Sequence, residues 1–366
     1  MEKLIIYGGS FDPIHNAHLR IAEAAALTLK GDVIFVPAKK MVWKDAVATD
    51  KDRLNMLKLA LASEGSSAFS ISLTEYNRPG KVSYSIDTVK EFKKKYKNRE
   101  LYFLLGGDEV NSFPKWKEPD EIARLAKIIY ADRPDIKIDQ AVVKAYNMTS
   151  LNYDKSGIVS SESTRNLSYV DSPARVLDYI ESHNLYYMAK ISPLLREKRL
   201  LHSISVAHLS YAIASKNHLQ NPGNAYIAGI LHDIGKNVSP EESRLMMKDI
   251  YPEFVSYPNW CLHQFVGRIM AENDFGITNG EILDAIEYHC SGKAHMPPLG
   301  KIVYSADKID PTRGWNSKSL IRQCLDDYYL GFLAVLKANR KFLVEEKGEF
   351  DMPLTEDCYR EYLGGK

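Results

Sequence analysis

The sequence predicts two domains, an α/β domain with a parallel sheet followed by an all-α domain. Three observations lead to this fold class. Short apolar runs alternate with helical segments through the first half of the chain, whereas only helical spacing remains beyond about Leu177. The length of 366 residues also exceeds the roughly 100–200 residues of one typical domain.

The first half predicts strands and helices in alternation. Apolar runs that end near glycine or proline predict strands at residues 3–9, 32–38, 100–108 and 127–134, and an alternating stretch predicts one more at 69–76. Segments with helical spacing lie between them at residues 17–31, 50–65, 83–97 and 118–126. Because strands separated by helices pair in parallel, we expect a sheet covered by helices on both faces.

The second half predicts helices throughout. Helical spacing recurs at residues 197–218, 224–236, 239–251, 261–274, 279–292, 300–310 and 317–348. Pro193 follows a helix end shortly before the first of these segments. We therefore expect the first domain at residues 1–188, a linker at 189–196 and the second domain at 197–366.

The bulk composition excludes several classes of protein. A formal net charge of +1 gives no reason to expect a nucleic acid or an anionic membrane as partner. The four cysteines are scattered, which argues against a disulfide framework and against a cysteine zinc site. No signal peptide and no apolar run of about 18 residues is visible, so we expect a cytoplasmic protein. The oligomeric state stays open.

The stretch GGSFDPIHNAH, residues 8–18, stands where the first predicted strand gives way to a helix. Gly8 and Gly9 let the backbone approach a ligand closely, and ligands of open α/β sheets bind beyond the carboxyl ends of the strands. His15 and His18 fall on one face of the first helical turn, whose unpaired N–H groups favour a phosphate. Two histidines near a loop are more often surface residues, but this context favours a site that holds a triphosphate and stabilises charge on its phosphorus.

The same stretch resembles the signature of the HxGH nucleotidylyltransferases, and among them the bacterial nicotinate mononucleotide adenylyltransferases. Ala17 stands where the family's motif has glycine. The resemblance implies a Rossmann-like domain in which the phosphate of nicotinate mononucleotide attacks the α-phosphorus of ATP and releases pyrophosphate. It implies no covalent intermediate, and it implies Mg²⁺ that arrives with ATP. His15, His18 and Arg165 would be the catalytic residues.

Further segments extend this resemblance over about residues 1–188. It implies ATP contacts from residues of four segments, namely Gly8, Gly9, Ser10, Phe11, His15, His18, Lys44, Gly106, Asp108, Ser160, Ser161 and Arg165. It also implies contacts to the mononucleotide from Ser85, Asp87 and Trp116. Each of these segments is weak evidence alone. Trp116, for example, is as often a packing residue as a ligand contact. Their order along one α/β domain makes the joint signal strong.

The helical half carries a different set of polar residues on otherwise apolar segments: His202, His232, Asp233, His263, His289 and Asp307. A single histidine on a helix is more often a satisfied or half-exposed residue. Several imidazoles and carboxylates on core faces, however, imply mutual partners or a metal, because burial of an unpartnered polar side chain is costly. This donor set suits zinc, manganese or iron rather than calcium.

Residues 195–366 resemble the HD-domain phosphohydrolases, and specifically the bacterial, symmetrical diadenosine tetraphosphate hydrolases. The resemblance implies a dinuclear centre, with iron favoured over manganese or zinc. His202, His232, Asp233 and Asp307 would hold one metal, and His263 and His289 the second, with Asp233 bridging as a catalytic residue. Lys236 and Arg313 would contact the polyphosphate, and the product would be ADP.

Two alternatives stay open at this stage. In the first, the helical half is a nucleotide-binding regulatory module without catalysis, or an enzyme that hydrolyses another nucleotide. In the other, the first domain accepts nicotinamide mononucleotide, phosphopantetheine or a polyol phosphate. The segment SYSIDT (residues 83–88) and Trp116 favour a pyridine mononucleotide, but backbone donors decide between its acid and amide forms, and the sequence does not place them.

Overall fold

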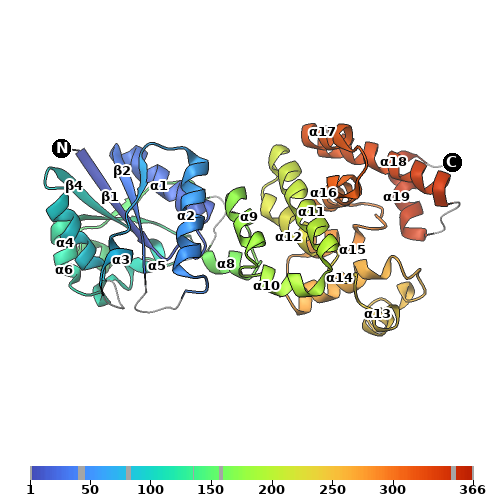
Figure 1. Cartoon of the computed structure of the whole chain (residues 1–366), viewed down its shortest axis with the longest axis horizontal. Helices are drawn as coiled ribbons and strands as arrows, with labels where there is room; N and C mark the ends of the chain where they lie inside the picture. Colours follow the sequence, from blue (N-terminus) through green and yellow to red (C-terminus); the bar gives the residue numbers. More distant parts are fainter. Residues whose placement is uncertain are drawn as a thin grey trace. The chain divides into compact units, whose positions relative to one another are not determined.

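The structure is a computed structural model that describes residues 2–39, 46–79, 84–134, 136–155, 160–347 and 352–364. It divides into two compact units (Figure 1). The first comprises residues 1–162 and 171–182, and the second comprises 163–170 and 183–366. The chain thus enters the second unit for eight residues, returns to the first, and then completes the second.

The first unit is built on a parallel sheet of six strands in the order β3-β2-β1-β4-β5-β6. The strands are β1 (Glu2–Gly9), β2 (Gly31–Pro37), β3 (Phe69–Ile71), β4 (Arg99–Gly106), β5 (Lys127–Ala131) and β6 (Thr149–Leu151). In the central strands β1, β2 and β4, runs of four or five consecutive residues are buried. This continuous burial confirms the predicted α/β class, since parallel strands are covered on both faces.

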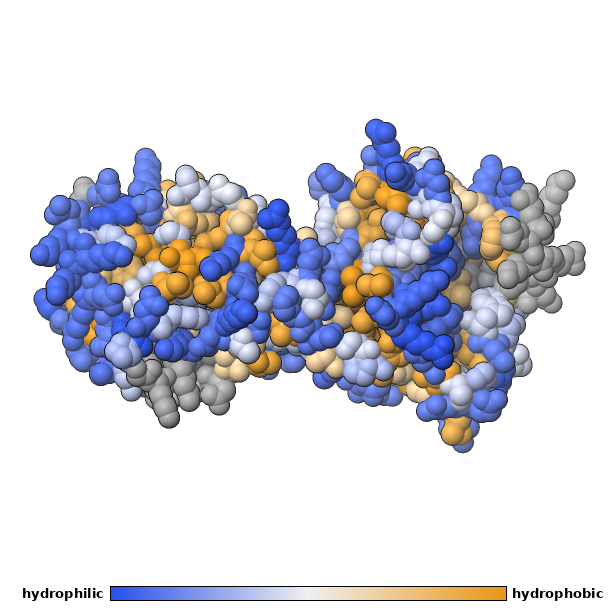
Figure 2. Space-filling view, in the orientation of Figure 1, coloured by the Kyte–Doolittle hydropathy of each residue, from blue (hydrophilic) through white to orange (hydrophobic). Residues whose placement is uncertain are grey.

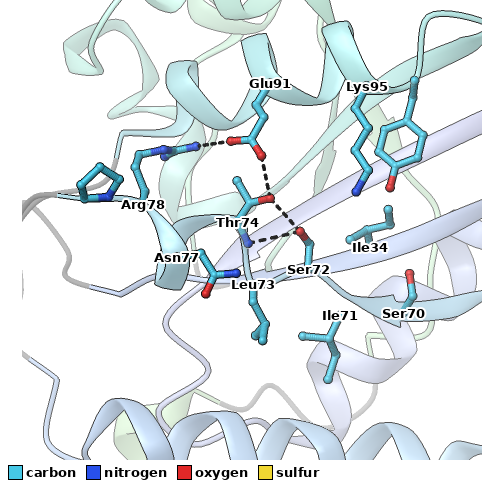
Figure 3. Close-up of a pocket in the computed structure, with 12 residues that line it drawn as sticks. Ile34, Ser70, Ile71, Ser72, Leu73, Thr74, Asn77, Arg78, Glu91 and Lys95 are labelled. Atoms are coloured by element: carbon cyan, nitrogen blue, oxygen red, sulfur yellow. Dashed lines mark hydrogen bonds and ion pairs between the residues drawn. The ribbon is translucent and has the colours of Figure 1, made fainter.

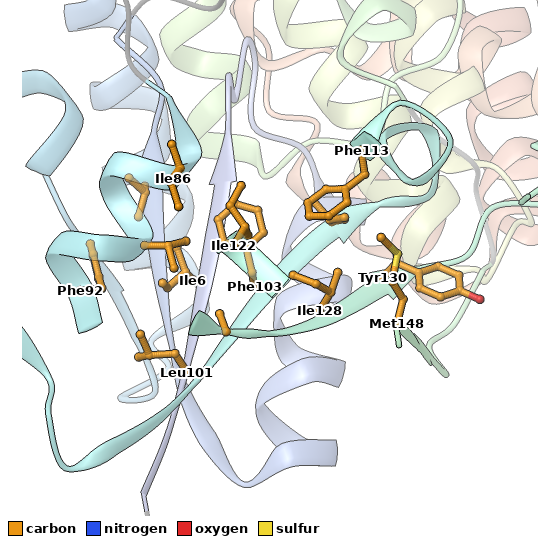
Figure 4. Close-up of a cluster of buried hydrophobic side chains, with 14 of the residues drawn as sticks. Ile6, Ile86, Phe92, Leu101, Phe103, Phe113, Ile122, Ile128, Tyr130 and Met148 are labelled. Carbon is orange, nitrogen blue, oxygen red and sulfur yellow. The ribbon is translucent and has the colours of Figure 1, made fainter. Parts of the chain in front are cut away.

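Helices follow the strands of this unit and cover the sheet. They are α1 (Asn16–Leu29), α2 (Asp50–Glu64), α3 (Thr74–Asn77), α4 (Ser85–Lys95), α5 (Gly107–Val110), α6 (Pro119–Leu125), α7 (Gln140–Ala145) and α9 (Ala174–Ser182). Figure 4 shows the core on one face of the sheet, where Ile86 and Phe92 of α4 and Ile122 of α6 pack against strand residues such as Phe103. Burial of these side chains stabilises the sheet whose carboxyl ends carry the first site.

The second unit is helical, as the sequence predicts. Its α-helices are α10 (Met188–Ile191), α11 (Glu197–Lys216), α12 (Pro222–Leu231), α13 (Pro240–Met247), α14 (Leu262–Asn273), α15 (Gly280–Tyr288), α16 (Pro298–Ile309), α17 (Lys318–Asp326), α18 (Tyr328–Lys347) and α19 (Pro353–Leu363). Short 3₁₀ helices stand at Ser192–Leu194, Pro252–Phe254 and Pro311–Arg313. A further short helix, α8 (Ser161–Arg165), spans the change from the first unit to the second.

Three segments differ from the sequence-based expectation. Residues 189–196, expected as a linker, form α10 and a 3₁₀ helix, because Met188, Ile191 and Leu195 are apolar and lie buried in the second unit. Residues 69–76 give only the short strand β3 before α3 begins. The single helix expected at 317–348 is divided into α17 and α18.

Hydrophilic side chains cover most of the visible face of each unit, with apolar side chains gathered in smaller areas (Figure 2). Among the helices of the described residues, none combines the length and the apolar character that a membrane span requires.

Candidate active sites

The first motif lies at the carboxyl edge of the parallel sheet. It begins in the last residues of β1, and its histidines stand at the start of α1, with His15 as the residue before the helix. The imidazole rings of His15 and His18 stack with centroids 3.7 Å apart, and the Nδ1 atom of His18 accepts a hydrogen bond from the backbone N–H of His15. The structure therefore brings together the two predicted histidines.

Both imidazoles are neutral in this environment. Burial, together with the positive charge of Arg133, lowers the pKa of His18 to about 3. Burial also holds the pKa of His15 well below its usual value, with His18, Arg20 and Arg133 acting in the same direction. The buried Nδ1 atom of His15 has no hydrogen-bond partner among the described residues. A neutral imidazole with a free ring nitrogen can accept or donate one hydrogen bond to a ligand.

Arg53, on α2, holds the loops around this motif in place. Its guanidinium donates hydrogen bonds of 2.7 Å to the carbonyl oxygens of Ser10 and Ala38, and it bonds Asp50 at 2.8 Å. The side chain is 1% exposed, so it acts inside the protein and does not reach a ligand. The carboxylate of Asp12 fixes the same region because it accepts hydrogen bonds from the backbone N–H groups of Val47 and Ala48.

Two further motif residues are explained by their surroundings. Phe11 has a left-handed backbone (φ +47) and is buried, and its ring lies 5.3 Å from that of His18, so its side chain supports the histidine ring. Ala17 occupies the second position of α1, where the helical backbone suits alanine. The departure from glycine at this position therefore requires no strained backbone.

The end of β4 carries the second predicted segment. Gly106 is its last residue, and a side-chain carbon at this position would lie 2.6 Å from Oδ1 of Asp108, so a larger residue would displace this carboxylate. The backbone N–H of Gly106 donates to the carboxylate of Glu109. Burial, together with Asp108, raises the pKa of Glu109 to about 7. Because β4 pairs with β1 up to Leu104 opposite Tyr7, this segment lies beside the first motif.

The remaining predicted residues of this unit are placed as follows. Ser85 begins α4 and is half-buried, as is Asp87 in its first turn. Trp116 is half-buried against Phe103 and Phe113, with ring centroids 6.1 and 5.4 Å away. Ser160 is half-buried. Ser161 donates a hydrogen bond of 2.9 Å to the carbonyl of Pro13, which ties this segment to the first motif.

Two predicted ATP contacts are not placed at this site. Arg165 is the half-buried last residue of α8 and falls in the second unit. Lys44 lies outside the described residues.

A separate pocket of about 660 Å³ lies beside the edge strand β3 (Figure 3). Its lining includes Thr74, Arg78 and Glu91, and the carboxylate of Glu91 is bonded by both of the others. None of the predicted site residues lines it, and two of its charged side chains, Arg78 and Glu91, are paired with each other. It therefore adds nothing to the first site.

The second site gathers all six residues predicted from the helical half. They come from five places: His202 in α11, His232 and Asp233 after α12, His263 in α14, His289 after α15, and Asp307 in α16. All six are at most 6% exposed. Two groups of potential ligand atoms lie within 4.8 Å of one another, namely His202, His232 and Asp233, and Asp233, His263 and His289.

Asp233 is shared by the two groups. Its Oδ1 atom lies 3.2 Å from Nε2 of His263 and 3.8 Å from Nε2 of His289. Its Oδ2 atom lies 3.5 Å from Nε2 of His232 and 4.0 Å from Nε2 of His202. One carboxylate thus turns one oxygen to each group, as a bridging ligand does.

Asp307 completes the first group. Its Oδ1 atom lies 3.1 Å from Nε2 of His202 and 3.7 Å from Nε2 of His232. The buried Nε2 atom of His232, between the two carboxylates, has no hydrogen-bond partner among the described residues. An unpartnered imidazole nitrogen that faces two buried carboxylates fits a divalent cation, and the mixed nitrogen and oxygen donors suit a transition metal.

The electrostatics of the cluster favour charged acids. Burial opposes the charged form of both carboxylates, but their partners outweigh it. The neighbouring His232 and His263 hold the pKa of Asp233 well below its usual range, and Lys308 and Arg313 do the same for Asp307. Burial lowers the pKa of His232, His263 and His289. Neutral imidazoles and charged carboxylates are the ligand states that a metal requires.

Four cationic side chains lie beside the residues of this cluster. Arg199 bonds Asp233 at 2.7 Å, Lys308 bonds Asp307 at 2.8 Å, and Arg313 also bonds Asp307. The ammonium group of Lys236 lies 3.2 Å from the ring of His263. Lys236 and Arg313 were predicted here from the sequence, whereas Arg199 and Lys308 were not. The sequence offered only their positions, since Arg199 stands three residues before His202 and Lys308 directly follows Asp307.

The chain matches two family models and several curated proteins. Residues 6–166 match the family described as cytidylyltransferase-like, and residues 199–312 match the HD domain. A Mycoplasma pneumoniae protein described as "Probable nicotinate-nucleotide adenylyltransferase/Ap4A hydrolase" is 31% identical over 91% of this chain and 98% of its own length. A Mycoplasma genitalium protein with the same description is 33% identical over 85% of this chain and 88% of its own length.

A shorter relative matches the first part alone. It is the Aquifex aeolicus protein described as "Probable nicotinate-nucleotide adenylyltransferase", which is 47% identical over 131 residues, or 35% of this chain and 76% of that protein. The two halves of the chain are thus similar to two different kinds of protein, and whole-length relatives combine them in the same order.

Proposed function

Because the chain belongs to the family of nicotinate-nucleotide adenylyltransferase/Ap4A hydrolase fusions, we propose that each unit carries out one of the two reactions in that description. The first unit transfers the adenylyl group of ATP to nicotinate mononucleotide, which gives deamido-NAD and pyrophosphate. The second unit hydrolyses diadenosine tetraphosphate to ADP. The observation that carries the proposal is the gathering of the predicted polar residues into two chemically different clusters.

His15 and His18 are the centre of the first reaction. As neutral rings at the start of α1, they can donate hydrogen bonds to the triphosphate of ATP beside the positive end of the helix dipole. The phosphate of the mononucleotide attacks the α-phosphorus of ATP. The bond between that phosphorus and the oxygen that bridges to the β-phosphate breaks, and pyrophosphate is released. The two rings stabilise the negative charge that develops on the phosphoryl oxygens. Mg²⁺ that accompanies ATP would neutralise part of the same charge.

The other residues of this proposal bind and orient the substrates. Gly8, Gly9, Gly106 and Asp108 line the carboxyl edge of the sheet, where the nucleotide is expected. Ser160 and Ser161 adjoin the first motif through the bond to Pro13. Lys44 and Arg165 would contact the triphosphate. Ser85, Asp87 and Trp116 would receive the pyridine mononucleotide, with the indole ring held by its packing on Phe113.

The second unit would bind its metals through the six residues of the His/Asp cluster. Iron is favoured, with manganese or zinc as alternatives. A divalent cation at such a site lowers the pKa of bound water and polarises a phosphoryl oxygen. Asp233 and Asp307 carry the negative charge that attracts the cation. Arg199, Lys236, Lys308 and Arg313 supply positive charge for the polyphosphate bridge of the substrate.

A side-by-side assay tests the first reaction. Purified full-length protein with ATP and Mg²⁺ should produce deamido-NAD from nicotinate mononucleotide faster than NAD from nicotinamide mononucleotide. The variant His18→Ala should lose this activity. His218→Asn is the matched control, because His218 is an exposed histidine with a left-handed backbone that asparagine tolerates. Failure of the unaltered protein to form either dinucleotide would refute the first half of the proposal.

A metal analysis tests the second reaction. The purified protein should contain near-stoichiometric transition metal and convert diadenosine tetraphosphate to ADP, and His232→Ala should lose both properties. A protein that binds no metal and turns over no dinucleoside polyphosphate would instead favour the regulatory module. That alternative predicts nucleotide binding that is unaffected by His232→Ala.

A further inference from the structure

Asp310 is a buried carboxylate behind the His/Asp cluster that the proposed reaction does not use. It directly follows α16 and is 0% exposed. Its Oδ2 atom lies 2.7 Å from Nδ1 of His202, on the side of the ring that faces away from the cluster. Ser205 donates a hydrogen bond to its Oδ1 atom, and Thr312 donates one to Oδ2.

These contacts fix the state of the His202 ring. The hydroxyl groups of Ser205 and Thr312 donate hydrogen bonds to the two carboxylate oxygens, so Asp310 stays ionised and accepts a hydrogen bond from Nδ1 of His202. A ring that donates from Nδ1 keeps its lone pair on Nε2. That Nε2 atom faces Asp307 at 3.1 Å and Asp233 at 4.0 Å. We propose that Asp310 is a positioning residue for the metal centre, because it fixes the tautomer and orientation of His202.

The positions of two other histidines of the cluster explain why His202 needs this partner. His232 and His289 each follow the end of a helix, and their Nδ1 atoms lie 2.7 Å from the carbonyl oxygens of Gly229 and Ile286. Carbonyls in the last turn of a helix lack an intrahelical partner, so they are available to accept these bonds.

His202, in contrast, lies inside α11, where the carbonyl three residues earlier is engaged in the helix. An acceptor from another element must take over, and Asp310 supplies it. The carboxylate of Asp310 therefore accepts the Nδ1 hydrogen bond of His202, as backbone carbonyls do for His232 and His289.

The inference rests on the proposed function in one respect, that the cluster holds a divalent metal. Outer partners of this kind typically change metal affinity by about 10–100-fold when they are removed. We therefore expect Asp310→Ala in the full-length protein to bind Mn²⁺ about 10–100-fold more weakly than the unaltered protein. Asp310→Asn should lie between the two, because its amide oxygen can still accept from Nδ1 while its charge is lost.

Ser205→Ala is the matched control. It removes one bond to Asp310 but leaves the carboxylate, Thr312 and the contact to His202, so Mn²⁺ affinity should stay close to the original value. The second readout is the visible absorption of Co²⁺, which reports the ligands around the ion. Asp310→Ala should change this spectrum, whereas a residue that acts only in packing lowers the melting temperature and leaves the spectrum of the folded protein unchanged.

The outcomes separate this inference from the proposed function. If the unaltered protein binds neither Mn²⁺ nor Co²⁺, the metal centre itself is refuted. If it binds both, and folded Asp310→Asn and Asp310→Ala bind them with unchanged affinity and spectrum, the positioning role is refuted and the metal centre stands. Should Asp310→Ala fail to fold, the comparison of Asp310→Asn with Ser205→Ala decides.

Discussion

Gly235 offers the sharpest test of how the second site is assembled. It follows Asp233 by two residues and packs against the backbone of α14. A side-chain carbon at this position would lie 2.7 Å from the carbonyl oxygen of His263 and 2.8 Å from the backbone nitrogen of Gly267. Relief of the clash with the carbonyl to ordinary contact at 3.4 Å requires an opening of about 0.7 Å.

The substitution Gly235→Ala should therefore affect stability and metal binding together. Its backbone φ is not in the left-handed region, so alanine is not strained there, and the whole cost comes from the clash. Overpacking of this kind lowers the free energy of unfolding by about 1–3 kcal/mol. Alanine also restricts the unfolded chain more than glycine does, which offsets about 0.4–1 kcal/mol of this loss. The same opening displaces His263 by more than the roughly 0.2 Å that ligand distances tolerate.

Thermal unfolding without metal and titration with Mn²⁺ measure the two effects. Gly235→Ala should melt at a lower temperature and bind Mn²⁺ more weakly. Gly280→Ala is the matched control, because Gly280 begins α15 and a side-chain carbon there meets nothing within 4 Å. It should leave Mn²⁺ binding unchanged and raise the melting temperature slightly. Equal Mn²⁺ affinities for the two variants would refute the reasoning.

Three predictions concern the first unit. His18→Asn should slow deamido-NAD formation by about 10²-fold or more, as loss of a charge-stabilising donor does; a change of less than a few-fold would exclude a catalytic role. Arg53→Met should destabilise the unit by about 3 kcal/mol, because three carbonyl oxygens and Asp50 lose a charged donor, and faster hydrogen exchange of β1 would report it. Stability should fall as the pH drops from about 6.5 towards about 3, since the unfolded chain binds a proton at His18 that the folded state refuses. The protection of the β1 amides, measured as their exchange rate relative to the intrinsic rate at each pH, should fall over this range in the unaltered protein, and His18→Asn should weaken that fall.

Much of the fold follows from local patterns in the sequence. Consecutive apolar residues in β1 and β4 can be buried only between two layers, so the parallel sheet was predictable from them. The predicted strand at 69–76 ends early because Ser72 accepts a hydrogen bond from the backbone N–H of Thr74, which starts α3. An alternating pattern does not reveal such a turn.

The division of the last long helix has a similar cause. The carboxylate of Asp327 accepts hydrogen bonds from the backbone N–H groups of Tyr329 and Leu330, and so caps a new helix. Gly331 then packs directly against the backbone of Cys324 in the preceding helix. The apolar spacing continues through this corner, so periodicity alone predicts one helix where tertiary contacts make two.

The candidate sites were predictable where residues share a motif and were missed where only folding brings them together. The spacing in GGSFDPIHNAH places His15 and His18 on one helical turn, and the HD dipeptide with its scattered partners indicated a cluster. Arg53 reaches the first motif from α2, and its side chain bonds carbonyl oxygens, which carry no signal in the sequence. Asp310 lies three residues after Asp307, but its role depends on α11, which lies more than 100 residues earlier.

Histidine itself does not decide which chemistry a site supports; its partners do. The rings of the buried His15 and the half-buried His18 stack near Arg20 and Arg133, and these surroundings keep them uncharged. His202 is buried as well, yet its bonds to Asp307 and Asp310 outweigh burial and raise its pKa. A pocket that rejects a proton in the first unit can offer N–H donors to an anion, whereas the two carboxylates beside His202 attract positive charge, which is a proton on the ring until a metal ion displaces it. The same side chain therefore suits an anion in one unit and a cation in the other, and the neighbouring acids account for the difference.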